Sequence, residues 1–173
     1  IIVNLSTTSA VEEVAKKYGV DVIRSAVGEI NVVDDMKKYK SDIGGEGNGG
    51  VILKESHLGR DAFVASIIIL NHLANQNLTM NQANNNIPKF HMLKSKVNLD
   101  NKVDSELISK NIKSLFHSYD FNEIDGIKIS NDTSWAHIRK SNTEPIIRVY
   151  IESKIQKEVK VIFDKIKSVF SEK

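Results

Sequence analysis

The stretch of residues 75–88 constrains the fold most, because it separates two parts of the chain with different hydrophobic patterns. It contains six asparagines and two glutamines, and it has few residues that strongly favour a helix or a strand. A helical turn followed by a loop, or an interdomain linker, would each fit this composition. We therefore expect two units, residues 1–90 and residues 91–173, with the boundary near residues 88–93.

The pattern before this stretch alternates between strands and helices. Expected strands cover residues 1–5, 20–24 and 42–44, and expected helices cover residues 10–18, 29–39 and 61–74. Ser9 and Glu12 have the spacing of a capping box for the first helix, and Gly19 ends it. Such alternation is typical of a small α/β unit whose strands are parallel.

The pattern after the stretch indicates a different architecture. Expected strands cover residues 91–99, 126–130, 134–139 and 146–152, and expected helices cover residues 103–117 and 154–170. Each helix carries an apolar stripe, formed by Val103, Leu107, Ile108, Ile112, Leu115 and Phe116 in the first and by Ile155, Val159, Ile162, Ile166, Val169 and Phe170 in the second. This predicts an α+β unit, an antiparallel sheet with helices on one face.

Composition excludes several classes of function. The 173 residues carry a net charge of only +2 and include no cysteine, which rules out disulfides and thiolate nucleophiles and gives no support to nucleic-acid binding. The longest apolar run, from Phe63 to Leu70, is too short to span a membrane. With no signal peptide, a cytoplasmic protein is expected. The apolar start of the chain, Ile1 to Val3, lacks a methionine and suggests a fragment of a longer protein.

The histidines are scattered and match no metal-ligand spacing. His57 and Arg60 come just before Asp61 at the start of an expected helix. Asp61 there complements the helix dipole, and we favour this structural interpretation over a ligand-binding role for His57 or Arg60.

The segment from Arg139 to Pro145, Arg-Lys-Ser-Asn-Thr-Glu-Pro, is a candidate phosphate-binding loop. A phosphate monoester is bound well by a forked guanidinium together with hydroxyl and backbone N–H donors. Arg148 in the following strand would add a second guanidinium, although a solvated strand face explains it equally well. A polar turn between two strands is the alternative interpretation of the whole loop.

The segment from Gly44 to Gly50 is a second candidate site. Five glycines in seven residues would let a ligand approach the backbone closely. Glu46 and Asn48 supply its only side chains, and their carboxylate and amide suit sugar hydroxyls. The apolar Val51–Leu53 follows where a dinucleotide-binding motif would open a helix, so we reject that motif. A flexible hairpin remains the alternative.

The two loops, in this order and about ninety residues apart, resemble the C-terminal half of the α-D-phosphohexomutases, which include phosphoglucomutase, phosphomannomutase and phosphoglucosamine mutase. The resemblance covers essentially the whole chain, with the third domain over residues 1–90 and the TBP-like fourth domain after it. In many members the sugar loop reads Gly-Glu-x-Ser-Gly, often followed by His, where this chain has Asn48 and Gly50. The resemblance implies phosphate binding by Arg139, Ser141, Asn142, Thr143 and Arg148, and sugar binding by Gly45, Glu46 and Asn48.

The resemblance also implies a reaction for the parent protein. Such an enzyme is an isomerase-class phosphotransferase and a phosphoprotein: a phosphoserine in the first domain phosphorylates a hexose phosphate, and the bound hexose bisphosphate reorients before returning a phosphoryl group. Mg²⁺ sits in an acidic loop of the second domain. This sequence contains neither a Ser-His-Asn-Pro-like serine loop nor an Asp-Gly-Asp-Gly-Asp-like metal loop. We therefore expect no catalytic residue, no metal site and no turnover in this chain alone.

The expected partners are a hexose phosphate and the N-terminal half of the same polypeptide, with no nucleic acid and no membrane. The preferred hexose is not indicated. Two other classes of function stay open at this point. One is a non-enzymatic phosphosugar-binding module that uses the same loops. The other is a nucleic-acid binder, suggested only by analogy of the second unit's layout and opposed by the near-neutral, interleaved charge.

Overall fold

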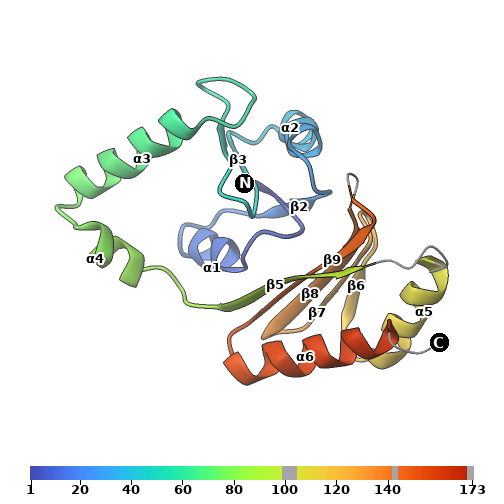
Figure 1. Cartoon of the computed structure of the whole chain (residues 1–173). Helices are drawn as coiled ribbons and strands as arrows, with labels where there is room; N and C mark the ends of the chain where they lie inside the picture. Colours follow the sequence, from blue (N-terminus) through green and yellow to red (C-terminus); the bar gives the residue numbers. More distant parts are fainter. Residues whose placement is uncertain (99–104, 142–143, 171–173) are drawn as a thin grey trace. The chain divides into compact units, whose positions relative to one another are not determined.

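The computed structural model describes residues 1–98, 105–141 and 144–170. The chain divides into two compact units, Ile1–Lys89 and Phe90–Lys173, and each unit has its own sheet (Figure 1). None of the helices within the described ranges combines the length and the apolar character needed to cross a membrane.

The first unit is an α/β layer. Its elements are β1 (Ile2–Asn4), α1 (Ala10–Lys17), β2 (Ile23–Ser25), α2 (Glu29–Lys38), β3 (Ile43–Gly45), β4 (Val51–Leu53), α3 (Ala62–Asn75) and α4 (Met80–Asn85). The sheet order is β2-β1-β3-β4, with β1 parallel to β2 and β3. The expected parallel arrangement is confirmed. β4 pairs antiparallel with β3, so the glycine-rich segment closes a hairpin.

The core of the first unit is small. α2 packs on the sheet and contributes three residues to the buried cluster. The cluster consists of Ile2 of β1, Val32, Val33 and Met36 of α2, and Ile52 of β4. The apolar helix α3 contributes no buried residue. Its side chains Phe63, Ile67 and Leu70 are 83%, 65% and 63% exposed.

The helix ends of the first unit differ in part from expectation. The expected capping box at Ser9 is wrong, because Ser9 has helical dihedral angles and its side chain makes no capping hydrogen bond. Glu12 pairs instead with Arg24 of β2. A genuine capping box joins Thr79 and Gln82, so the ambiguous stretch of residues 75–88 includes a short helix.

The second unit is an antiparallel sheet with two helices. Its elements are β5 (His91–Asn98), α5 (Ser105–Leu115), β6 (Asp120–Asn122), β7 (Ile127–Ser130), β8 (Ser134–Lys140), β9 (Ile146–Ser153) and α6 (Gln156–Val169). The sheet order is β5-β9-β8-β7-β6, and every neighbouring pair is antiparallel. The expected architecture is confirmed, and β6 is an additional edge strand. The expected strand end at residue 99 and helix start at residue 103 lie outside the described residues.

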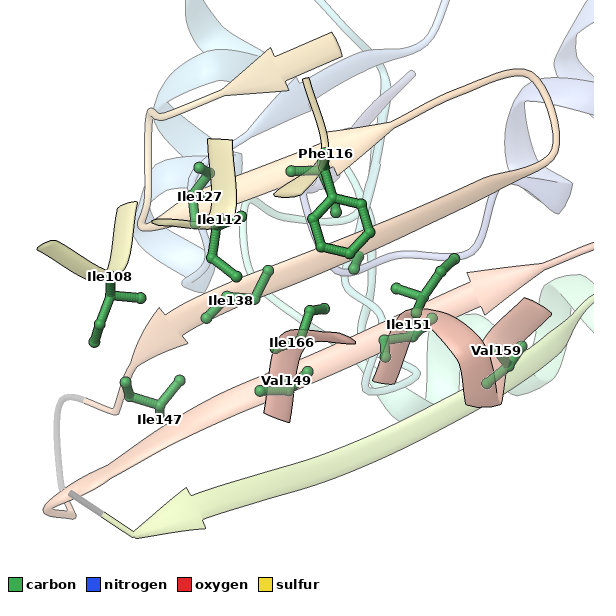
Figure 2. Packing of buried hydrophobic residues seen from close by; sticks show 13 residues of the cluster. Ile108, Ile112, Phe116, Ile127, Ile138, Ile147, Val149, Ile151, Val159 and Ile166 are labelled. Carbon is green, nitrogen blue, oxygen red and sulfur yellow. The ribbon is translucent and has the colours of Figure 1, made fainter. Parts of the chain in front are cut away.

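One face of this sheet forms a large core with α5 and α6 (Figure 2). The buried cluster is Ile108, Ile112, Phe116, Ile127, Ile129, Ala136, Ile138, Ile147, Val149, Ile151, Val159, Ile162 and Ile166. Leu107, Leu115 and Ile155, which we expected in the stripes, are 55%, 44% and 47% exposed. Each helix buries a narrower stripe. The buried residues of α5, Ile108 and Ile112, are four residues apart, and those of α6, Val159, Ile162 and Ile166, are three and four apart. Val103 lies outside the described residues.

The other face of the sheet carries polar side chains at the alternate strand positions. The indole Nε1 of Trp135 donates to Glu152 Oε1 at 2.8 Å, and the ammonium of Lys128 lies 4.3 Å from the centroid of the Trp135 ring. His137 Nε2 lies 2.7 Å from the backbone oxygen of Asp125. Because a carbonyl only accepts, Nε2 carries the proton. Burial lowers the pKa of His137 to about 4, so this histidine is neutral at pH 7.

Candidate functional site

The glycine-rich loop begins where two neighbouring parallel strands end. Asn4 is the last residue of β1, and Glu46 directly follows β3. The chain connects β1 to β2 on one side and then returns to β3 on the other, so its connections diverge between β1 and β3. Open α/β sheets bind ligands outside the carboxyl ends of strands at such a point.

Glu46 is the buried centre of this region, with a side chain only 4% exposed. Its Oε1 accepts a hydrogen bond from Asn4 Nδ2 at 3.0 Å, and its Oε2 accepts one from Asn48 Nδ2 at 3.4 Å. Arg60 Nη1 lies 3.0 Å from the same Oε2. A buried carboxylate without partners would be strongly destabilising, and these three donors compensate for the burial of its charge.

Arg60 links Glu46 to a second carboxylate, that of Glu29. Arg60 Nε donates to Glu29 Oε2 at 2.7 Å, and the backbone N–H of Arg60 donates to Glu29 Oε1 at 3.2 Å. These hydrogen bonds from Arg60 lower the pKa of Glu29, and the hydrogen bond to Glu29, followed by the charge of Glu46, raises the pKa of Arg60.

The loop after β1 is held in place by side chains that the sequence did not single out. Asn4 Oδ1 accepts hydrogen bonds from Ser6 N at 3.1 Å and from Thr7 Oγ1 at 2.9 Å. Arg24 Nη1 donates to the backbone oxygen of Asn4 at 3.0 Å, and its Nη2 to that of Thr8 at 3.3 Å. Asn4 is thereby fixed in the position from which it holds Glu46.

Asn4, Glu29 and Arg60 are the residues of this region that sequence reasoning missed or ranked low. Asn4 and Glu29 have one signal in common, because each comes at or shortly after the carboxyl end of a parallel strand. The sequence favoured a structural role for Asp61 at the helix start over a ligand-binding role for Arg60. The structural role of Asp61 is confirmed. Asp61 Oδ1 caps α3 by accepting from Phe63 N at 2.7 Å and from Val64 N at 2.9 Å.

Close packing requires two of the glycines in this loop, Gly47 and Gly50. A Cβ on Gly47 would lie 2.4 Å from the backbone oxygen of Ser6, and one on Gly50 would lie 2.3 Å from Arg60 Cδ. Asn48 also has a structural role in the turn, since its Oδ1 accepts from Gly50 N at 2.9 Å. The number of glycines by itself therefore does not indicate a ligand here.

An open pocket of about 520 Å³ lies beside this loop. Among the residues that line it are Glu29, Asn48 and Arg60. Glu46 is not among them, and it connects to the pocket through Arg60 and Asn48. The polar groups at the pocket are thus carboxylate, amide and guanidinium groups, which hydrogen-bond readily to hydroxyls. Gly45, the third expected sugar-binding residue, pairs with Val51 as part of β3.

In the second unit, the structure brings together three of the expected phosphate-binding residues. Arg139 of β8 and Arg148 of β9 occupy directly opposite positions. Two hydrogen bonds run from Arg148 to Ser141 Oγ, from Nε at 3.4 Å and from Nη2 at 3.3 Å. The same Nη2 donates to Glu144 Oε2 at 2.8 Å. The remaining two expected residues, Asn142 and Thr143, lie outside the described residues.

The charge arrangement at this loop is unusual for a sheet. Like charges directly opposite each other on antiparallel strands are destabilising, yet Arg139 faces Arg148. In the part of the chain that the structure describes, Arg139 Nε is buried and has no hydrogen-bond partner. An anion at this position would compensate both features, since guanidinium groups bind phosphate oxygens through paired N–H donors.

No group of three or more histidine, aspartate or glutamate side chains suited to a metal ion occurs among the described residues. The two candidate sites thus offer hydrogen-bonding and anion-binding groups.

Comparison with protein families identifies the family of both units. Residues 1–90 match the model for phosphoglucomutase/phosphomannomutase, alpha/beta/alpha domain III, and residues 92–169 match the model for the C-terminal domain of the same family. The chain belongs to the phosphoglucomutase/phosphomannomutase family. The two units correspond in order to its domains III and IV.

Relatives and solved structures agree with this family. The chain is 30% identical to the phosphoglucosamine/phosphogalactosamine mutase of Sulfurisphaera tokodaii, over 98% of this chain and 38% of that protein. A phosphoglucomutase/phosphomannomutase family protein from Burkholderia thailandensis matches with a TM-score of 0.79 at 20% identity, over 97% of this chain and 36% of that one.

Another structure, N-acetylphosphoglucosamine mutase from Aspergillus fumigatus in complex with GlcNAc-6P and magnesium, matches with a TM-score of 0.69 at 16% identity, over 98% of this chain and 41% of that one. At these identities the two solved structures show the fold alone. The chain spans 34 to 39% of the length of the curated relatives that it matches.

Proposed function

We propose that this chain supplies the sugar- and phosphate-recognition part of a phosphohexomutase, which interconverts a hexose 1-phosphate and a hexose 6-phosphate. Membership of the phosphoglucomutase/phosphomannomutase family supports this proposal, as do relatives that are named as mutases. The remainder of such an enzyme would lie in the N-terminal half of the same polypeptide, in the cytoplasm.

The single observation that carries the phosphate assignment is the opposed pair Arg139 and Arg148 beside the hydroxyl of Ser141. We assign these three residues to a phosphate clamp. By the family resemblance, Asn142 and Thr143 complete it. A clamp of this kind binds the phosphate that is not reacting, and so it holds the other end of the hexose toward the phosphoryl donor.

Sugar recognition is assigned to the glycine-rich loop of the first unit, at Gly45, Glu46 and Asn48. Each carboxylate oxygen of Glu46 has two lone pairs, and its three protein donors leave acceptor capacity for a hydroxyl. Glu29 and Arg60 extend the same network to the pocket. The remaining acceptor site of Glu46 can bind one sugar hydroxyl in either orientation of a hexose bisphosphate intermediate.

The phosphoryl-transfer step is assigned to the rest of the polypeptide. In the proposed enzyme a phosphoserine of the N-terminal half would donate the phosphoryl group, and Mg²⁺ bound in that half would supply charge stabilisation. We assign binding and orientation of the substrate to this chain. We expect no mutase turnover by these 173 residues alone, and detectable turnover would contradict that expectation.

An NMR titration of this chain tests the function. Glucosamine 6-phosphate is the ligand, and inorganic phosphate and free glucosamine are the controls. We expect phosphate to shift the signals of Arg139 and Ser141, and the phosphosugar to shift that of Glu46 as well. No response at Arg139 or Ser141 to either phosphate ligand would contradict the clamp. A non-enzymatic phosphosugar module would give the same shifts, and a mutase assay of the full-length parent separates the two.

A further inference from the structure

A third cation lies in the same row as the two arginines of the proposed clamp. On β5, Lys96 is directly opposite Arg148 of β9, which in turn is directly opposite Arg139 of β8. Opposite residues on neighbouring strands point to the same face of a sheet. Since strands lie about 4.8 Å apart, the three backbone positions span only about 10 Å.

The row has a net positive charge that the described residues do not neutralise. Glu144 pairs with Arg148 at 2.8 Å. None of the ion pairs found in the described residues involves Lys96 or Arg139. Three cations and one carboxylate leave about two positive charges, and a phosphate monoester carries about −1.5 to −2 at pH 7. The row and the ligand therefore match in charge.

A lysine on an edge strand has a simpler explanation, because such residues protect the edge from pairing with other chains. Lys94 provides the comparison. It lies on the same strand and the same face, opposite Tyr150, and its ammonium is 5.5 Å from the centroid of that ring. Lys94 thus has a cation–π partner, whereas the residue opposite Lys96 is another cation. Edge protection applies equally to both lysines and does not by itself account for a cation directly opposite Arg148.

We propose that Lys96 is a third cationic ligand of the phosphate, so that an anion held by Arg139 and Ser141 also receives a hydrogen bond from the Lys96 ammonium. This inference rests on the proposed function of the loop. A lysine acts as a mobile point charge, while arginine imposes a forked geometry. A clamp with both kinds of group can accept the phosphate of a hexose 1-phosphate or of a hexose 6-phosphate, whose sugars leave it at different angles.

The test compares Lys96→Met with the matched variant Lys94→Met in this chain. The dissociation constant for glucosamine 6-phosphate is measured by calorimetry at pH 7.5 and at pH 5.5, with circular dichroism to check the fold. We expect about fivefold weaker binding for Lys96→Met at pH 7.5 and less than a twofold change for Lys94→Met. Lys96→Arg is expected to restore most of the affinity.

The pH dependence separates a direct contact from a structural effect. The second phosphate pKa is about 6, so the ligand gains charge between pH 5.5 and pH 7.5. Lys96→Met should reduce the gain in affinity over this interval, which a merely structural loss would not do.

Equal weakening by both methionine variants would overturn the inference, because it would indicate a general effect of net charge. An unchanged Lys96→Met together with a weakened Arg139→Ala would overturn it as well, while leaving the proposed function intact. If the unmodified chain binds no phosphosugar, the proposed function and the inference both fail.

Discussion

The two units of this chain differ in how completely they bury their apolar residues. The second unit joins thirteen buried residues of its sheet, α5 and α6 into one cluster, whereas the corresponding cluster of the first unit has five. The fourteen-residue apolar helix α3 contributes none. A helix that is apolar on all sides is normally enclosed by other elements. The second unit therefore contains a complete core, and the first unit needs further cover for α3.

The two candidate sites also differ in how their side chains are held in position. In the first unit, a buried carboxylate is held by a network that joins Asn4, Glu46 and Arg60. In the second unit, Arg139 and Arg148 extend from paired strands whose register fixes their spacing. Sites on regular elements are positioned more rigidly than sites on loops. The phosphate site should therefore form without the first unit, while the sugar site depends on the first unit being fully folded.

The largest effect should come from separating the units. Residues 90–173 expressed alone should unfold cooperatively and give a dispersed NMR spectrum, because their core is complete. Residues 1–89 alone should aggregate or bind a hydrophobic dye, since α3 has no buried side chain. Thermal unfolding followed by circular dichroism checks both. A cooperative transition of residues 1–89 without dye binding would show that the first unit also has a complete core.

Matched truncations in two helices sharpen the same comparison. Ile112→Ala in α5 removes a side chain that is 0% exposed and should lower the free energy of unfolding by about 2–5 kcal/mol. Ile67→Ala in α3 affects a side chain that is 65% exposed and should cost less than about 0.5 kcal/mol. Urea titrations of both variants measure the difference. Similar losses would mean that α3 is covered in solution.

Acidification should destabilise the second unit through His137. The unfolded chain takes up a proton near the ordinary pKa of 6.5, whereas the folded chain does so only near 4. Stability is therefore complete above the unfolded pKa and is lost as the pH falls. The loss between pH 7 and pH 5 should be about 2 kcal/mol. His137→Gln should abolish it, as followed by urea unfolding at the two pH values.

This pH interval isolates His137 from two carboxyl groups. Hydrogen bonds from Ser134 and Ser153 lower the pKa of Glu158, and a hydrogen bond from Arg60 lowers that of Glu29. The contribution of these two carboxyl groups to folding stability is lost only as the pH falls below their ordinary pKa of 4.5. If His137→Gln retains the full pH dependence above pH 5, another group is responsible.

A smaller effect is expected at the sugar loop. Glu46→Gln keeps one acceptor oxygen, so its NH2 group must face either the Asn4 donor or the Arg60 donor, which leaves at least one donor without an acceptor. The free energy of unfolding of the first unit should fall by about 1–2 kcal/mol. Glu55→Gln, at an exposed position, is the control and should be neutral. Equal stability of the two variants, measured in urea, would mean that the Glu46 network does not hold the loop.

Much of the fold follows from the hydrophobic periodicity of the sequence, because burial of one face determines the pattern. The four-residue spacing of Ile108, Ile112 and Phe116 predicted α5. The short strand β6 was missed because Asp120 and Asn122 have little preference for strands. At Ser9, the local capping pattern was misleading because Glu12 pairs with Arg24 of a different element, and sequence spacing does not contain that contact.

The candidate sites were less fully predicted than the fold. Arg139, Ser141 and Arg148 are close in sequence, so the motif named them together. Asn4 and Arg60, in contrast, meet Glu46 across 42 and 14 residues of chain. Lys96 reaches the arginine row only through strand register. Contacts of this kind are decided by topology, and a single sequence does not show them.

The central claim is that the β8–β9 hairpin binds phosphate, and the most direct measurement is the affinity of Arg139→Ala for glucosamine 6-phosphate, determined by calorimetry. Removing charged hydrogen bonds should cost roughly 1.5–3 kcal/mol of binding free energy, with an unchanged fold. The control is Lys140→Ala, which removes an adjacent positive charge on the other face of β8 and should change the affinity little. If Arg139→Ala binds as tightly as the unmodified chain, the phosphate is bound elsewhere and the claim is wrong.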